Sequence, residues 1–123
     1  MAHKTKRRLH ISNKELQRAF GFLNHKFFAG RLHPTIRVRW ADLRKKKANG
    51  MWNDYEREIK IDRCMMQTGW NPIYIFMLHE MIHADLESAS DCYVGYKADE
   101  GHGTRFQGEI CRLLRAGAYD GLL

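Results

Sequence analysis

The chain contains a short pattern of side chains that can bind a metal ion on one helix face. His79 and His83 are four residues apart, and Glu80 directly follows the first histidine. Because an α-helix turns by about 100° per residue, two histidines at this spacing can hold the same ion. Zn²⁺ in a catalytic site takes three protein ligands and binds water at the fourth position, lowering the pKa of that water. A glutamate beside the first ligand can accept the water's proton, so the pattern predicts metal-assisted amide hydrolysis with Glu80 as general base.

A third ligand is needed for such a site, and His102 is the candidate. It follows His83 by nineteen positions and stands between two glycines. We therefore expect one Zn²⁺ per chain, bound by His79, His83 and His102.

Other classes of metal-dependent hydrolase place their third ligand at a different spacing. A metzincin would have a histidine six residues after His83, and so would the three-histidine type of metal-dependent ribonuclease, but Ala89 is at that position. A glutamate ligand from a following helix, as in thermolysin-like sites, stays open and would be Glu100 or Glu109.

Two segments resemble the SprT-like domain, a family that includes the Spartan proteases. They are residues 78–84, LHEMIHA, and residues 101–106, GHGTRF. Residues 22–24, 27–32 and Pro34 look like the family's first helix and its exit, so the resemblance runs from about residue 12 to 115. It implies a compact zincin-like protease core, Zn²⁺ on the three histidines, Glu80 as base, and substrates that are often proteins bound or crosslinked to DNA.

Apolar periodicity predicts the elements that position these residues. Ser12 and Glu15 form a capping box for a helix that continues to Gly30, with its apolar residues at helical spacing. Residues 35–40 and 58–62 alternate with period two and predict strands, and a turn at residues 49–50 leads into a short strand at 51–53.

Two further helices complete the expected fold. The metal-binding helix should begin with Asn71 as N-cap and Pro72 at its first position. A last helix is expected over residues 104–115, with an inward face made of Phe106, Ile110, Leu113 and Leu114. The prediction is an α+β, single-domain, minimal zincin-like fold over residues 12–123, with a small, mostly antiparallel sheet and a basic tail at 1–11.

Positive charge is clustered along the chain, whose formal net charge is +7. Such clusters bind phosphate backbones with little regard to sequence, although they also serve solubility. Trp40 and Trp52 are candidate stacking surfaces for unpaired bases. The candidate DNA contacts are Arg7, Arg8, Arg37, Arg39, Arg44, Lys45, Lys46 and Lys47.

Three secondary features have both a functional and an ordinary interpretation. Residues 50–53 are a candidate edge strand for an extended peptide, or a hairpin strand whose Trp52 belongs to the core. Asp85 and Glu87 could orient a ligand imidazole, or simply be solvated. Candidates for stabilising an oxyanion, which could equally be packing residues, are Tyr93, Tyr96 and Lys97.

The remaining sequence features bear on location and class. The chain has no run of eighteen apolar residues, no apolar segment after its basic start, and three cysteines without a CxxC pair. We expect an intracellular monomer, cytoplasmic or nucleoid-associated. The predicted function is a zinc-dependent metalloprotease acting on peptide bonds of DNA-associated proteins. The alternative is a nucleic-acid-binding module in which zinc is structural and no bond is cut.

Overall fold

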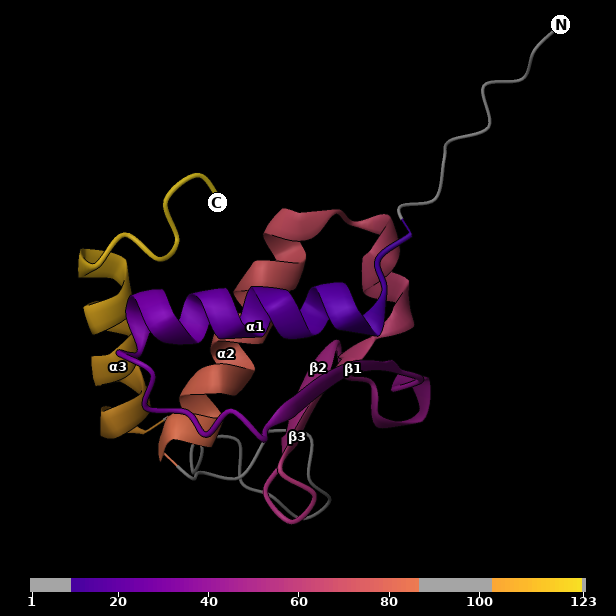
Figure 1. Cartoon of the computed structure of the whole chain (residues 1–123), viewed down its shortest axis with the longest axis horizontal. Coiled ribbons are helices and arrows are strands. Elements are labelled where there is room, and N and C mark those ends of the chain that lie inside the picture. Colours follow the sequence, from indigo (N-terminus) through magenta and orange to yellow (C-terminus); the bar gives the residue numbers. More distant parts are fainter. Residues whose placement is uncertain (1–9, 87–102, 123) are drawn as a thin grey trace, which may run out of the picture.

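Three α-helices and a three-stranded sheet form the fold in the computed structural model, which describes residues 10–86 and 103–122 (Figure 1). Two short 3₁₀ helices, η1 and η2, connect these elements. The predicted α+β class is confirmed. In chain order the elements are α1 (Asn13–Phe27), β1 (Arg37–Ala41), η1 (Arg44–Lys46), β2 (Gly50–Asn53), β3 (Glu58–Asp62), η2 (Arg63–Gln67), α2 (Trp70–Leu86) and α3 (Thr104–Arg115).

The sheet is mixed, so the prediction of a mostly antiparallel sheet is wrong. Its strand order is β1-β3-β2, with β1 parallel to β3 and β2 antiparallel to β3. The chain reverses once between β1 and β2 and again in the hairpin between β2 and β3. Two reversals give β3 the direction of β1, and β3 lies between the other two strands.

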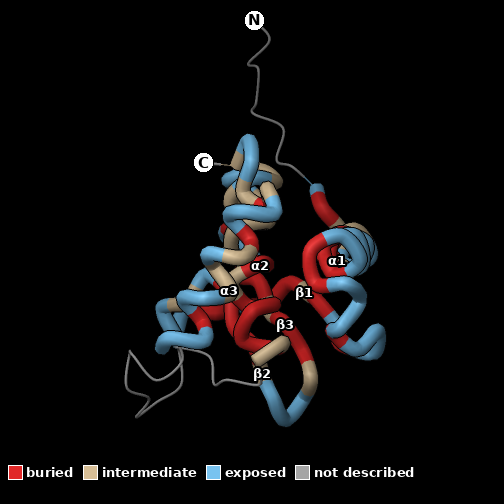
Figure 2. Tube along the Cα trace, turned by 90° about the vertical axis from the view of Figure 1, so that its left-hand side faces the viewer, coloured by how far each residue is buried: buried red, intermediate tan, exposed pale blue. Residues whose placement is uncertain are grey.

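The two faces of the sheet differ in polarity because successive side chains point to opposite sides. Val38, Ile59 and Trp52 are buried in the main core, which also contains the apolar faces of α1 and α2. Both helices therefore cover the same face of the sheet (Figure 2). The other face carries Arg39 and Lys60, which alternate with these core residues.

Helix α1 begins at the predicted capping box. The Ser12 hydroxyl accepts a hydrogen bond from the Glu15 N–H at 3.1 Å, and the Ser12 N–H donates to Glu15 Oε1 at 3.3 Å. The helix ends at Phe27, and the N–H of Gly30, at φ +71°, donates to the Asn24 carbonyl. Its buried apolar residues are the predicted ones, Leu16, Ala19, Phe20, Leu23 and Phe27.

The other helices confirm the predicted elements but correct two details. Helix α2 begins at Trp70, so Asn71 is inside it and is not the N-cap, and Pro72 is not at its first position. The Asn71 Nδ2 donates to the Gly121 carbonyl at 3.1 Å. Helix α3 has the predicted bounds and buries Phe106 and Leu113, but Leu114 is 50% exposed. Adjacent residues on a helix are about 100° apart, and Leu114 lies beyond the edge of the narrow face that α3 buries through Phe106 and Leu113.

Within residues 10–86 and 103–122, no helix has the length and apolar content needed to cross a membrane.

Candidate functional site

The two histidines of α2 lie at the distance that a shared zinc ion requires. Their Nε2 atoms are 3.3 Å apart, and His83 is fully buried while His79 is half-buried. Two nitrogens bound tetrahedrally to Zn²⁺ at the usual bond length are about 3.3 to 3.4 Å apart. The donor pair therefore fits zinc in both chemistry and spacing.

Phe106 on α3 packs against both imidazoles. Its ring centroid lies 5.0 Å from that of His79 and 4.7 Å from that of His83. The first turn of α3 is thus fixed beside the histidine pair. His102, the predicted third ligand, lies outside the described residues, and within the described ranges no group of three metal-binding side chains is found.

Glu80 follows His79 on α2 and packs against the sheet. It is only 2% exposed, and it faces Gly50 at the start of β2. A Cβ on Gly50 would be 3.4 Å from Glu80 Cγ and 3.5 Å from its Oε2, in ordinary van der Waals contact, so a side chain larger than a methyl group would meet the carboxylate. The sequence placed Gly50 both at a turn and at the start of the candidate edge strand 50–53, and β2 has these bounds. The contact with Glu80 was not predicted, because local sequence does not report which helix residue faces a strand.

A cavity of about 280 Å³ opens beside Glu80. One side comes from α2 and the other from the loop that leads into β2. The lining residues are Lys46, Lys47, Ala48, Asn49, Gly50, Phe76, His79 and Glu80. In the described part of the chain β2 pairs only with β3, so the edge strand, the base candidate and one histidine meet at this cavity. Trp52 on the same strand is fully buried, which confirms the interpretation of Trp52 as a core residue.

Two acidic residues near the pair are held by arginines. Arg31 Nη2 donates to Asp85 Oδ2 at 2.9 Å and to Glu109 Oε1 at 3.3 Å. Arg112 Nε donates to Glu109 Oε2 at 2.7 Å. Both carboxylate oxygens of Glu109 are thus occupied by guanidinium groups, which argues against Glu109 as a metal ligand. Asp85 forms an ion pair and is not simply solvated.

The predicted DNA contacts differ in how far their charge is neutralised. Arg39 Nε is 2.6 Å from Glu58 Oε1, and Arg44 Nη2 is 2.8 Å from Asp42 Oδ2. Four other candidates are exposed and form no ion pair with any described residue, namely Arg37, Lys45, Lys46 and Lys47. Arg7 and Arg8 lie outside the described residues, as do Glu87, Tyr93, Tyr96, Lys97 and Glu100.

The predicted stacking role of the two tryptophans is wrong. Trp40 and Trp52 are 6% and 0% exposed, and both belong to the main core. The Trp40 indole Nε1 donates to the Ile11 carbonyl at 2.6 Å. Both rings point inward because they occupy the core-facing positions of their strands.

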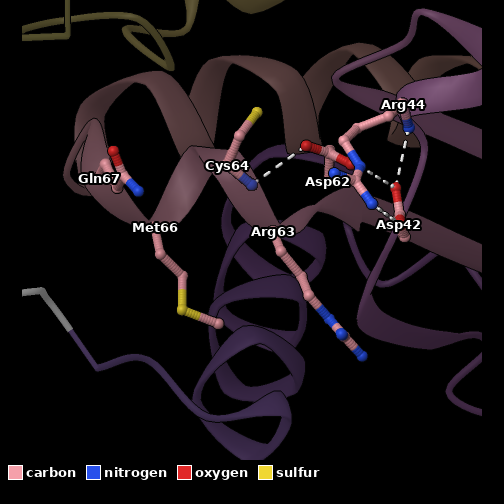
Figure 3. A pocket seen from close by; sticks show the side chains of 7 residues that line it. All are labelled: Asp42, Arg44, Asp62, Arg63, Cys64, Met66 and Gln67. Atoms are coloured by element: carbon pink, nitrogen blue, oxygen red, sulfur yellow. Dashed lines mark hydrogen bonds and ion pairs between the residues drawn. The ribbon is translucent and has the colours of Figure 1, made fainter.

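A second cavity, of about 400 Å³, lies beside η2 and away from the histidines (Figure 3). Asp42, paired with Arg44, has its pKa lowered to about 2 by the guanidinium and backbone hydrogen bonds. The pKa of the exposed Cys64 thiol is raised, chiefly by its hydrogen bond to Asp62, so this thiol is not an activated nucleophile. The residues lining this cavity are Asp42, Arg44, Asp62, Arg63, Cys64, Met66 and Gln67.

The structure thus places a histidine pair and a buried glutamate on one helix of a small α+β fold. Comparison with protein families is more specific. The SprT-like family matches residues 16–117, so the chain belongs to the SprT-like family, which is typically associated with zinc and with metallopeptidase function. No curated protein and no solved structure matches the chain.

Proposed function

We propose that the protein is a zinc-dependent metallopeptidase that hydrolyses peptide bonds. The ligands are His79, His83 and His102, and Glu80 is the general base. The observation that carries the proposal is the 3.3 Å separation between the Nε2 atoms of His79 and His83 on α2. Glu80, the residue after His79, lines a cavity at the edge strand β2. Membership of the SprT-like family supports it.

The chain's own residues provide most of the chemistry. Zn²⁺, when bound, would supply a Lewis acid that lowers the pKa of a bound water and polarises a carbonyl oxygen. Glu80 accepts the proton of the attacking water and passes it to the leaving amine. Its burial beside Gly50 limits its rotamers, so the carboxylate is held ready for this transfer.

The edge strand provides a way to hold the substrate. An extended peptide can add to β2 as a further strand, with its backbone N–H and C=O groups paired to those of residues 50–53. This places the peptide along the rim of the cavity that contains His79 and Glu80. The requirement for an extended chain favours unfolded or flexible segments as substrates.

DNA-associated proteins are the proposed substrates. The exposed cations Arg37 and Lys45, which lie outside the cavity beside Glu80, support binding of phosphate backbones without sequence preference. The rival function, a nucleic-acid module with structural zinc, would require a closed site with four protein ligands. Such a site has no use for a buried carboxylate that faces a cavity.

The test replaces the carboxylate of Glu80 by an amide. In Glu80→Gln the side chain is nearly isosteric but cannot accept a proton, so we expect cleavage of a labelled unfolded casein to fall by at least about 100-fold. Zinc content, measured by mass spectrometry, and melting temperature should stay at the parental values. Asp120→Asn, the same chemical change at an exposed position, should retain full cleavage.

Two outcomes would contradict the proposal. Parental cleavage by Glu80→Gln would remove Glu80 from the mechanism. Zinc binding without any cleavage by the parent, assayed with and without DNA, would favour the structural-zinc module.

A further inference from the structure

The cavity beside Glu80 has one basic wall. Lys46 and Lys47 line it together with His79 and Glu80, and Phe76 contributes an apolar side. Both lysines are exposed, and neither forms an ion pair with a residue in the described ranges. Lys46 Nζ lies 3.9 Å from Met51 Sδ, and Glu80 is the acidic residue among those that line the cavity. The cavity therefore has two lysines on one side and the candidate reaction centre on the other.

The loop that carries the two lysines has a defined backbone. The Lys46 N–H donates to the Leu43 carbonyl at 3.0 Å, and the Lys47 N–H donates to the Arg44 carbonyl at 3.1 Å. Leu43 is buried in a small cluster with Ala41 and Met51. This packing holds the backbone of Lys46 and Lys47 in place. Less conformational entropy is therefore lost when the two side chains bind a ligand.

A buried carboxylate anchors the same loop. Asp62 Oδ1 accepts the Leu43 N–H at 2.6 Å, and the Asp62 N–H donates to the Asn49 carbonyl at 2.8 Å. Both ends of the loop are thus tied to the last residue of β3. Lys47 itself has a left-handed backbone, with φ 51°, which turns the chain toward β2.

We propose that Lys46 and Lys47 form a subsite that selects an acidic side chain, aspartate or glutamate, in the peptide bound along β2. This inference rests on the proposed peptidase function. In an added strand every second side chain points to the same side, so one substrate residue near the scissile bond would face the cavity. Two ammonium groups would form charge-assisted hydrogen bonds with a carboxylate and would repel a basic side chain.

The size and position of the cavity favour a peptide side chain over a nucleic-acid phosphate. A volume of about 280 Å³ is slightly below the range of small-molecule sites and suits a single side chain. The cavity is also shared with His79 and Glu80, where a substrate residue must lie and where DNA has no role in peptide hydrolysis.

The experiment measures selectivity with matched peptides. Quenched fluorescent peptides that carry Glu, Gln or Lys at each position around the scissile bond are cleaved by the full-length zinc-loaded protein. We expect kcat/KM at one position to favour Glu over Gln by about tenfold, and Glu over Lys by more. In Lys46→Gln/Lys47→Gln this preference should fall toward one, chiefly through KM, while the Gln peptide is cleaved as by the parent.

Two further variants make the test sharper. The charge reversal Lys46→Glu/Lys47→Glu should favour the Lys peptide over the Glu peptide. Lys14→Gln/Arg18→Gln removes the same net charge from exposed positions of α1 and should keep the parental preference. Melting temperature and zinc content identify any variant that fails to fold.

Each contrary outcome has a separate meaning. Cleavage by the parent with no preference for Glu at any position would overturn the subsite and leave the peptidase function standing. Equal loss on Glu and Gln peptides would mean that the lysines serve the reaction itself and would overturn selection. Weaker DNA binding with unchanged peptide selectivity would assign the lysines to phosphates instead. If the parent cleaves no peptide, the peptidase function itself fails.

Discussion

Gly50 on β2 lies directly against Glu80 on α2, with the glycine's missing Cβ only 3.4 Å from Glu80 Cγ. The lysine-lined cavity, the edge strand and the candidate base therefore meet at a position where a larger side chain would disturb all three. The Lys60 carbonyl, 3.5 Å from the same Cβ position, limits movement on the other side.

The first prediction compares two substitutions of Gly50. In Gly50→Ala the added methyl group makes ordinary contacts, so cleavage should stay within about fivefold of the parent. In Gly50→Val the γ-methyl groups must displace Glu80, and a misplacement of about 1 Å can lower kcat/KM by about 100-fold. Steady-state cleavage with zinc content and melting temperature as controls checks this. A fully active valine variant would show that Glu80 does not depend on this contact.

The second prediction concerns the ion pairs that join α2 to α3. Arg31 bridges Asp85 and Glu109, and Arg31→Ala should leave the two carboxylates without this cation. Because the Arg31 side chain is 45% exposed, water screens the pairs, and we expect a loss of only about 1 kcal/mol in the free energy of unfolding. Urea denaturation of the zinc-loaded protein measures it.

Arg105→Ala is the matched control for this measurement, since Arg105 is exposed on α3. Equal stability of the two alanine variants would mean that the Arg31 pairs contribute nothing. A loss well above the expected value would mean that Arg31 also holds groups beyond Asp85 and Glu109.

The third prediction is a pH dependence that originates at Asp62. Burial alone would raise the pKa of this carboxyl, but hydrogen bonds from Cys64 and from the Leu43 N–H outweigh it and lower the pKa below its ordinary value. A lowered folded-state pKa gives stability that is present above about pH 4 and is lost as the pH falls through the folded-state pKa.

Asp62→Asn tests this sign, because the amide does not titrate. The difference in melting temperature between parent and variant should be largest near pH 6 and should shrink as the pH falls from 5 to 3. Carboxyl groups shared by both proteins cancel in the difference. Parallel melting curves over that range would contradict the assignment.

Local signals in the sequence were sufficient for several elements. The capping box at Ser12 and the apolar repeat fixed α1, and strict alternation fixed β3 at its observed bounds. The same alternation points the Trp40 and Arg39 side chains to opposite faces of the sheet, so it already implied that Trp40 is buried. A stacking role for Trp40 would need an exposed ring and contradicts this pattern. The strand assignment was sound, and the error was in the side-chain interpretation.

The parts that could not be predicted depend on contacts between distant residues. Parallel pairing of β1 with β3 is set by how the chain reverses through residues 42–49, where hydrogen bonds from Asp62 and burial of Leu43 decide the path. The contact of Gly50 with Glu80 joins residues thirty positions apart. Spacing alone brought His79 and His83 together, because both are on one helix.

The last prediction concerns DNA. If all three exposed lysines bind phosphates when no peptide is present, Lys45→Gln/Lys46→Gln/Lys47→Gln should weaken binding to many DNA sequences alike. The slope of log K against log salt concentration should then fall in magnitude by about three. Arg44→Gln is the matched control on the same loop, because Asp42 already pairs with that charge, and it should change the slope much less. Fluorescence anisotropy over a salt titration measures both.

Strand preference gives the same experiment a second readout. Since Trp40 and Trp52 are buried and offer no stacking surface, single-stranded and double-stranded DNA should bind with similar affinity. Equal salt slopes in the parent and the triple variant would remove this loop from the interface. No binding at low salt would rule out the DNA association itself, while the peptidase chemistry at Glu80 would be unaffected.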